Sequence, residues 1–245
     1  MNLSGLTDIG SVRKDNQDSY AIRVLDDHLA VAVVCDGMGG AQAGNVASAI
    51  AVEAFAASVE DSCKDGVPQD SRERSGILSV ACRKANDQVY SLSESNPEYQ
   101  GMGTTLVAAL IMPDEIHVIN VGDSRCYLIT DGKPQQITQD HSLVQVLVNR
   151  GEITPEQART HPKKNLITRA LGVEPEIAGD LYRIPSQEGG WLLLCSDGLT
   201  NVLPDQTIAA EVARAVSPET CCRELLAKTL EQGATDNVTV VLAQL

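Results

Sequence analysis

Ala30-Val31-Ala32-Val33-Val34-Cys35-Asp36-Gly37-Met38-Gly39-Gly40 is the stretch that decides the fold, because an apolar run ends there in an aspartate and a glycine-rich turn. Such a run predicts a buried β-strand that leads into a tight turn. The same design recurs before Asp123 and before Asp197, and it is inverted at Asp236, which precedes an apolar run. The sequence therefore predicts four aspartates at strand ends.

Other patterns indicate how these strands are arranged. The β-rich runs 105–112 and 115–121 flank Pro113-Asp114, which predicts a hairpin. Three helices are predicted from alanine content, apolar spacing or a Ser-Pro start, at residues 43–58, 77–92 and 219–230. Because regular strand-helix-strand spacing is absent, we expect an α+β fold with mainly antiparallel sheets.

The charge balance limits the classes of partner. The chain has 33 acidic and 19 basic residues, for a formal net charge of -14, which would repel nucleic acid and anionic membrane surfaces. No stretch approaches the ~20 apolar residues needed to cross a bilayer, and the N-terminus has no basic region followed by an apolar run. We therefore expect a cytoplasmic protein that neither binds nucleic acid nor inserts into membranes. Its 245 residues fit a single domain spanning 1–245.

The seven cysteines include no CxxC pair and no Cys/His cluster. Four lie in apolar runs, namely Cys35, Cys82, Cys126 and Cys195. We expect buried thiols, not disulfides or zinc ligands. Of the adjacent pair Cys221-Cys222, one thiol is expected to be buried and the other half-exposed.

Aspartates at strand ends suit hard divalent cations. Mg²⁺ and Mn²⁺ prefer carboxylate, carbonyl and water oxygens, and clustered carboxylates repel one another unless cations neutralise them. Two such ions ~3.5–4 Å apart can share a water and lower its pKa, which suits the hydrolysis of phosphate esters. The alternative is that each Asp-Gly pair is only a turn, since the sequence does not show that the aspartates meet in space.

The aspartates also belong to an ordered series of motifs that spans most of the chain. The series comprises Thr7-Asp8-Ile9-Gly10 with Arg13 and Asn16-Gln17-Asp18, then Asp36-Gly37-Met38-Gly39-Gly40, Gly101-Met102-Gly103-Thr104-Thr105, Val121-Gly122-Asp123-Ser124-Arg125, Thr138-Gln139-Asp140-His141, Ser196-Asp197-Gly198-Leu199 and Asp236-Asn237-Val238-Thr239. In order and spacing it resembles the PPM (type 2C) metal-dependent serine/threonine protein phosphatases, above all the small bacterial members. The resemblance implies a four-layer α-β-β-α sandwich with two central, mainly antiparallel β-sheets flanked by helices. It also places the family's mobile flap at residues 143–172.

The resemblance further implies roles for single residues. Two Mn²⁺ or Mg²⁺ ions per subunit are implied, with Asp36 bridging both and the Gly37 carbonyl completing the first site. Asp197 and Asp236 would bind the second ion. The catalytic step implied is direct attack on phosphorus by a water or hydroxide that bridges the two ions.

Three further positions match functional residues of the family. Asp123, together with Asp197, matches a third, weaker metal site. Asp18 matches an acidic position that binds metal-bound water. Arg13 matches the arginine that grips the substrate phosphate, a task suited to a planar fork of donors. Outside the family context, Arg13 would be an ordinary surface charge.

The chain also departs from the family pattern. Met38 stands where some eukaryotic members have a histidine proposed as general acid. Ala41 and Asn45 stand where many bacterial members have histidine and glutamate. His141 is interpreted as a structural polar contact with an acid-base role as the alternative, and His161 as a residue of the flap surface or a substrate contact.

The implied partners are phosphorylated proteins, including the substrates of a bacterial serine/threonine kinase and that kinase itself, and a monomer is expected. Two alternatives stay open from the sequence. One is a catalytically silent relative that binds phosphoproteins, although every proposed ligand is present. The other is a phosphohydrolase acting on nucleotides or small metabolites, which activity on p-nitrophenyl phosphate and on phosphopeptide would separate.

Overall fold

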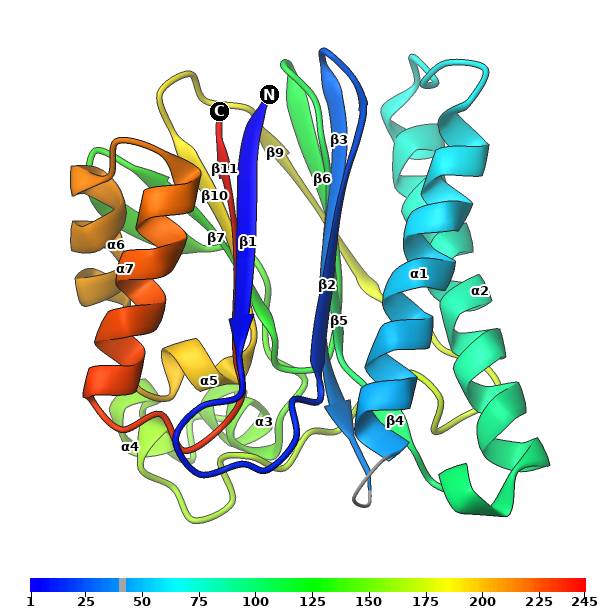
Figure 1. Cartoon of the computed structure of the whole chain (residues 1–245), viewed down its shortest axis with the longest axis vertical. Coiled ribbons are helices and arrows are strands. Elements are labelled where there is room, and N and C mark those ends of the chain that lie inside the picture. Colours follow the sequence, from blue (N-terminus) through cyan, green and yellow to red (C-terminus); the bar gives the residue numbers. More distant parts are fainter. Residues whose placement is uncertain (40–42) are drawn as a thin grey trace.

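The computed structural model describes residues 1–39 and 43–245, so Gly40 and Ala41 of the sequence motifs lie outside the described residues. Two β-sheets stand face to face between two layers of helices (Figure 1). This is the α-β-β-α sandwich expected from the sequence. All strand pairs of the two sheets are antiparallel in the described part of the chain, which confirms the predicted sheet type.

Each sheet combines strands from distant parts of the chain. The first sheet has the order β1-β11-β10-β7-β8, with β1 (Asn2–Asp8), β11 (Val238–Gln244), β10 (Trp191–Cys195), β7 (Arg125–Thr130) and β8 (Lys133–Gln136). The second has the order β2-β3-β5-β6-β9, with β2 (Asp18–Asp26), β3 (Leu29–Met38), β5 (Leu106–Ile111), β6 (Glu115–Val121) and β9 (Asp180–Pro185), while the short β4 (Gly103–Thr104) pairs with β3. The hairpin predicted around Pro113-Asp114 is confirmed by β5 and β6.

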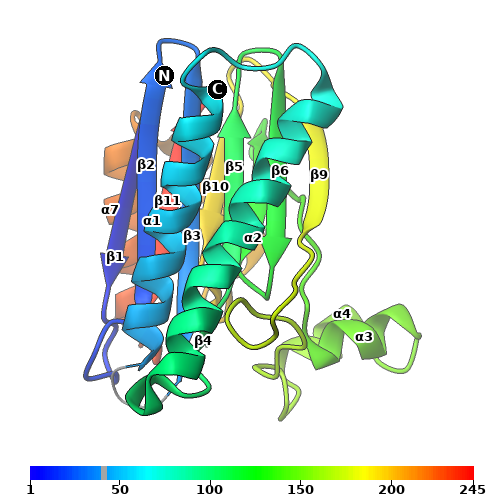
Figure 2. The same ribbon diagram turned by 90° about the vertical axis from the view of Figure 1, so that its right-hand side faces the viewer.

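Helices cover the outer faces of both sheets. Helices α1 (Ala43–Cys63) and α2 (Ser71–Ser95) lie on the second sheet, and α6 (Asp205–Arg214) and α7 (Pro218–Glu231) lie on the first (Figures 1 and 2). Apolar clusters fill the two helix-sheet interfaces and the space between the sheets. The four layers are therefore held together by three apolar interfaces, each of which removes side chains from water.

The predicted helices form, and their ends have local causes. Helix α7 begins after Ser217, whose hydroxyl accepts a hydrogen bond from the Thr220 amide, as the Ser-Pro signal predicted. Helix α2 begins six residues before the predicted start, because Asp70 caps it by accepting from the amides of Arg72 and Glu73. Helix α1 continues to Cys63, five residues beyond its predicted end.

All seven cysteines are free and buried, which confirms the prediction of buried thiols for Cys35, Cys82, Cys126 and Cys195. The expectation that one of Cys221 and Cys222 would be half-exposed is wrong, since both are 0% exposed. The cause is β1, which is distant from α7 in the sequence but packs against it. The thiol of Cys222 contacts the backbone carbonyl of Ser4 in that strand, with a distance of 3.4 Å between sulfur and oxygen.

The stretch 143–172 forms two short helices, α3 (Leu143–Asn149) and α4 (Pro155–Arg159), beside the strand ends that lead into the site (Figure 2). Isolated bridges join Ser142 to Ile167 and Thr104 to Leu171, so the stretch leaves and rejoins the sandwich at neighbouring points. Two single-turn helices complete the fold, the 3-10 helix at Pro97–Tyr99 and α5 at Asp197–Thr200.

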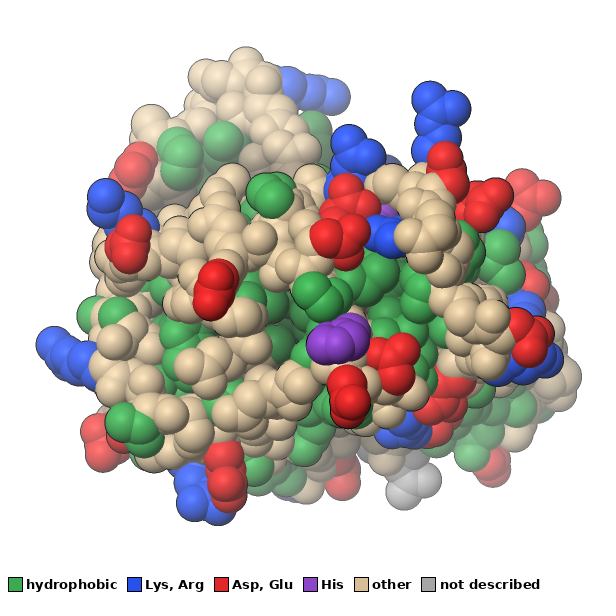
Figure 3. All heavy atoms as spheres, turned by 90° about the horizontal axis from the view of Figure 1, so that it is seen from above, with side chains coloured by type: hydrophobic (Ala, Val, Ile, Leu, Met, Phe, Trp, Pro, Cys, Tyr) green, Lys and Arg blue, Asp and Glu red, His purple; other side chains and the backbone are tan. Residues whose placement is uncertain are grey.

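The end of the molecule that carries both termini lies opposite the short helices α3, α4 and α5 (Figure 1). On this end acidic and basic side chains are interspersed with apolar ones (Figure 3). Within residues 1–39 and 43–245, no helix is long and apolar enough to cross a membrane.

Candidate active site

A cavity of about 240 Å³ opens at the end of the sandwich where α5 begins and β3 ends. Six of the seven residues singled out from the sequence line it, namely Arg13, Asp36, Gly37, Asp123, Asp197 and Asp236. The seventh, Asp18, is buried and lies directly opposite Asp36 in the register of β2 and β3. The fold thus brings together carboxylates that are up to 218 positions apart in the chain.

Asp36 is held by its backbone at the end of β3. Its amide donates to the Thr105 hydroxyl at 2.9 Å, and its carbonyl accepts from the Thr104 hydroxyl at 2.9 Å and from the Thr105 amide at 2.9 Å. The following residue, Gly37, has no room for a side chain, because an added Cβ would lie 2.0 Å from the carbonyl oxygen of Gly44. The Asp36-Gly37 pair is therefore fixed by close backbone packing.

Asp18 lies beneath the cavity and joins the two sheets. Its Oδ2 accepts hydrogen bonds from the hydroxyls of Ser196 and Thr239, each at 2.7 Å, while its Oδ1 is buried without a hydrogen-bond partner among the described residues. Burial is the main cause that raises the pKa of Asp18 to about 7; the two hydrogen bonds act against it, and the neighbouring Asp197 and Asp236 carboxylates act with it. A charged carboxylate buried in this position is unfavourable unless a positive charge lies nearby.

Asp197 and Asp236 come from the first sheet. Asp197 is the first residue of α5, with one oxygen bonded to Asn201 at 2.8 Å and the other buried without a partner among the described residues. Burial, followed by the charge of Asp236, raises the pKa of Asp197 to about 6. Asp236 accepts from the Asn237 amide at 2.9 Å, just before β11 begins.

Arg13 reaches the cavity from the loop after β1. Its side chain is 51% exposed, and its Nη2 donates to Asp236 at 2.7 Å. That hydrogen bond and the surrounding aspartates raise the pKa of Arg13. A cation that enters the cavity would therefore compete with Arg13 for Asp236. A phosphate would compete with Asp236 for Arg13.

The donor set fits divalent cations in its chemistry. Burial, and after it the neighbouring carboxylates, raise the pKa values of Asp36 and Asp123 well above the ordinary range. Bound cations would relieve this repulsion and use the unpartnered oxygens of Asp18 and Asp197. As the side chains stand in the described part of the chain, no three acidic, histidine or cysteine groups are close enough together to enclose an ion. Instead, Arg13 and Asn201 hold one oxygen each of Asp236 and Asp197.

Comparison with known proteins agrees with this geometry. A family model described as protein phosphatase 2C matches residues 11–232. The chain belongs to the protein phosphatase 2C family. The serine/threonine phosphatase stp of Listeria welshimeri is 38% identical over 239 residues, which cover 97% of this chain and 93% of that protein.

Solved structures give the same result for this phosphatase 2C chain. The serine/threonine phosphatase Stp1 from Staphylococcus aureus has a TM-score of 0.92 and 35% identity, covering 100% of this chain and 95% of that one. The catalytic domain of the phosphatase PstP, solved in complex with two manganese ions, has a TM-score of 0.85 and 36% identity over 99% of this chain and 96% of that one. The chain is therefore a metal-dependent enzyme of the protein-serine/threonine phosphatase class.

His141, the histidine of the phosphatase 2C motif at residues 138–141, makes hydrogen bonds with the backbone of Gly122. His141 Nδ1 accepts from the Gly122 amide at 3.0 Å, and the His141 amide donates to the Gly122 carbonyl at 2.9 Å. Its Nε2 lies 3.2 Å from Asp180, and burial lowers its pKa. These contacts support the structural interpretation, because they hold the turn that carries Asp123. His161 is half-buried, and its ring accepts from the Lys163 amide.

Several residues of the site were not singled out from the sequence. Those that line the cavity are Gln17, Gly39, Thr105, Asn165, Ile167 and Asn237. The first three and Asn237 lie within the quoted motifs, so their positions carried a signal, but their contacts did not. Asn165 and Ile167 lie in the stretch 143–172, where nothing in the sequence pattern pointed to them.

Proposed function

We propose that this phosphatase 2C enzyme hydrolyses phosphoserine and phosphothreonine in proteins, with two Mn²⁺ or Mg²⁺ ions in the cavity at the strand ends. The observation that carries the proposal is the convergence of four aspartates from both sheets on one cavity, together with one exposed arginine. When bound, two divalent cations lower the pKa of a shared water and supply a nucleophile for direct attack on phosphorus.

The residues of the chain would divide this work. Asp36 and the Gly37 carbonyl would hold the first cation, and Asp197 and Asp236 would hold the second with Asp36 shared between them. A buried, crowded carboxylate set would favour the binding of both ions, since the added positive charge would relieve the repulsion between the carboxylates. The backbone clamp on Asp36 would keep the shared ligand in place during the reaction.

The remaining residues would act around this pair. Asp123 and Asp197 would hold a third, weaker cation, and Asp18 would accept from water beneath the cavity. Arg13 would orient the phosphoryl group and stabilise the charge that develops on its oxygens. To do so, its guanidinium would exchange part of its bond to Asp236 for the substrate.

The wider assignments rest on the sequence and on relatives. We propose that the enzyme reverses the action of a bacterial serine/threonine kinase, with phosphorylated proteins as substrates. Residues 1–245 would act as a single domain with a mobile flap at 143–172. A monomeric state and a cytoplasmic location stay predictions from the sequence.

The test is phosphate release from a phosphothreonine peptide in Mn²⁺, in Mg²⁺ and in EDTA. We expect turnover with either metal, none in EDTA, and a loss of about 10³-fold or more in Asp36→Asn with the fold retained by circular dichroism. Asp27→Asn removes an exposed carboxylate in the turn between β2 and β3 and should keep full activity. The proposal is wrong if the folded wild-type protein releases no phosphate with either metal. Hydrolysis of p-nitrophenyl phosphate without any peptide turnover would favour small phosphoesters as substrates.

A further inference from the structure

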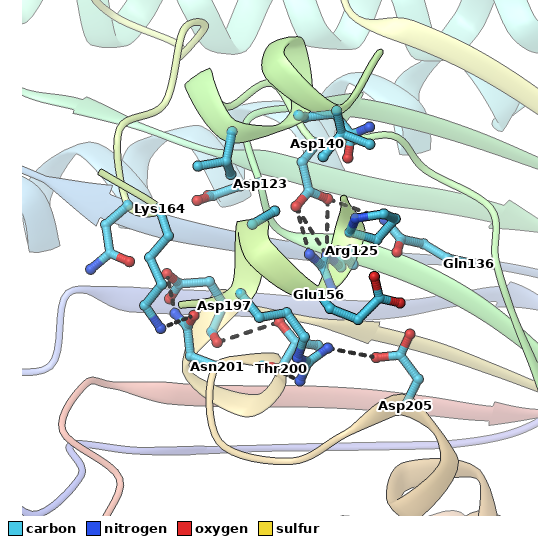
Figure 4. Close-up of a pocket in the computed structure, with 17 residues that line it drawn as sticks. Asp123, Arg125, Gln136, Asp140, Glu156, Lys164, Asp197, Thr200, Asn201 and Asp205 are labelled. Carbon is cyan, nitrogen blue, oxygen red and sulfur yellow. Dashed lines mark hydrogen bonds and ion pairs between the residues drawn. The ribbon is translucent and has the colours of Figure 1, made fainter. Parts of the chain in front are cut away.

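A second cavity of about 350 Å³ continues from the active site along the helices of the stretch 143–172. Asp123, Asn165 and Asp197 line both cavities, so the two are joined at the site of the proposed chemistry. In Figure 4, Asp123 and Asp197 lie at one end of this second cavity, and Glu156 and Asp205 lie at the other. A group bound along it would reach from the phosphate site to these two acids.

One side of this cavity, formed by α3 and α4, carries apolar residues. Val144 and Val148 of α3 and Pro155 and Ala158 of α4 line it. Such a wall suits the aliphatic stem of a long side chain, because lysine and arginine bury their methylene groups while their charge stays at a polar end.

The far end of the cavity offers one unpaired carboxylate. Glu156 makes no ion pair within residues 1–39 and 43–245. Its position is set by the start of α4, where Thr154 and Gln157 form a reciprocal cap between side chains and backbone amides. Asp205 lies close by, with its Oδ1 3.8 Å from the Arg159 guanidinium.

Apart from Asp123 and Asp197 at the phosphate end, the other charged groups of the cavity already have partners. Arg125 and Asp140 form a close pair at 2.7 Å. Arg159 also donates to the Thr200 carbonyl at 3.2 Å, and Lys164 donates to Asn201 at 2.8 Å, near the phosphate end. The charge at the far end that has no ionic partner among the described residues is therefore negative.

We propose that this second cavity binds a lysine or arginine side chain of the substrate, one that lies a few residues from the phosphorylated serine or threonine. The inference rests on the proposed function and adds to it a preference for basic phosphopeptides. The stem would lie on the α3 and α4 wall, and the charged end would pair with Glu156. The net charge of -14 on the enzyme would also favour basic over acidic substrates during encounter.

The experiment compares phosphothreonine peptides that carry lysine, norleucine or glutamate at one position, moved from four residues before to four residues after the phosphothreonine. Norleucine keeps the stem of lysine and removes its charge. At one or two positions we expect kcat/KM for lysine to exceed that for norleucine about fivefold at low ionic strength, and less at high salt. Because each ratio is taken within one enzyme, differences in overall activity cancel.

Two variants identify the partner of the charge. Glu156→Gln should reduce the lysine-to-norleucine ratio to about one, and Glu156→Lys should favour the glutamate peptide at the same position. Glu152→Gln is the matched control, since it removes an acid of the same stretch that does not line the cavity, and it should keep the preference.

The outcomes separate this inference from the proposed function. The basic subsite would be wrong if lysine is preferred at no position, or if Glu156→Gln and Glu152→Gln lose the preference equally. Either result would leave the proposed phosphatase function intact. Hydrolysis of p-nitrophenyl phosphate without turnover of any peptide would overturn the proposed function and the subsite together.

Discussion

The strand ends and the stretch 143–172 border the same cavity but are built differently. At the strand ends, Asp36 is clamped by three backbone hydrogen bonds, and Asp18 is tied to both sheets. By contrast, among the residues of helices α3 and α4, which the structure describes in full, only Val144 is buried. The comparison suggests that the sandwich fixes the chemistry, whereas the helices beside it can change sequence or position and so adjust which substrates fit.

The largest expected difference between the two regions is in their tolerance of a single methyl group. In Gly198→Ala, the added Cβ would lie 1.9 Å from the Asn237 carbonyl oxygen, so backbone would have to move. We expect the free energy of unfolding to fall by about 3 kcal/mol or more, measured by urea denaturation. Gly151→Ala, in the stretch 143–172, meets nothing within 4 Å but has a φ of +71°, and should cost only about 1 kcal/mol. Equal losses in the two variants would contradict the comparison.

A second difference is that the carboxylates at the strand ends make the free energy of unfolding depend on pH and on bound metal ions. Because the pKa of Asp18 is raised from 3.8 to about 7, the folded protein holds a proton that the unfolded chain releases between these values. The unfolded state then binds fewer protons, so this group lowers the free energy of unfolding as pH rises from about 4 to 7. Asp197, with a pKa of about 6, acts in the same direction.

Thermal unfolding in EDTA and in Mg²⁺ tests this. Without metal, the midpoint of the wild-type protein should fall more steeply from about pH 4 to pH 7 than that of Asp18→Asn, whose amide stays neutral. Comparing the two proteins cancels the opposite contribution of the buried histidines, whose pKa values are lowered. Mg²⁺ should raise the wild-type midpoint most at the higher pH. Parallel pH curves in EDTA would show that Asp18 does not carry the effect.

The smallest expected effect lies in α4. Thr154→Ala removes the hydroxyl that caps this helix and should cost about 1 kcal/mol locally. Because α4 buries little, we expect faster hydrogen exchange of its amides with almost no change in the global unfolding midpoint. A fall in the midpoint as large as that of Gly198→Ala would mean that α4 is part of the cooperative core.

The strand ends could be predicted from the sequence because their signals are local. A buried strand followed by Asp-Gly combines an apolar run with a turn signal, and the structure places Asp36 and Asp197 where that pattern predicts them. The antiparallel arrangement followed from the hairpin signal and the irregular spacing of helices. The ordered motif series, through its resemblance to a family, supplied the layer order.

What the sequence did not show depends on contacts between distant segments. The burial of Cys222 depends on β1, and the environment of Asp18 depends on hydroxyls of Ser196 and Thr239. Such pairings are fixed only when the sheets meet. The cavity along α3 and α4 was equally hidden, because its lining side chains follow no periodic pattern.

The tie of Asp18 in β2 to Thr239 in β11 has a consequence for how the enzyme comes into being. The two residues are separated by 221 positions, so this hydrogen bond forms only after β11 has joined its sheet. Contacts this far apart are slow to form, because most of the chain must be ordered first. During synthesis, the growing chain would therefore stay inactive until β11 has joined its sheet, and a protein truncated before β11 would lack activity.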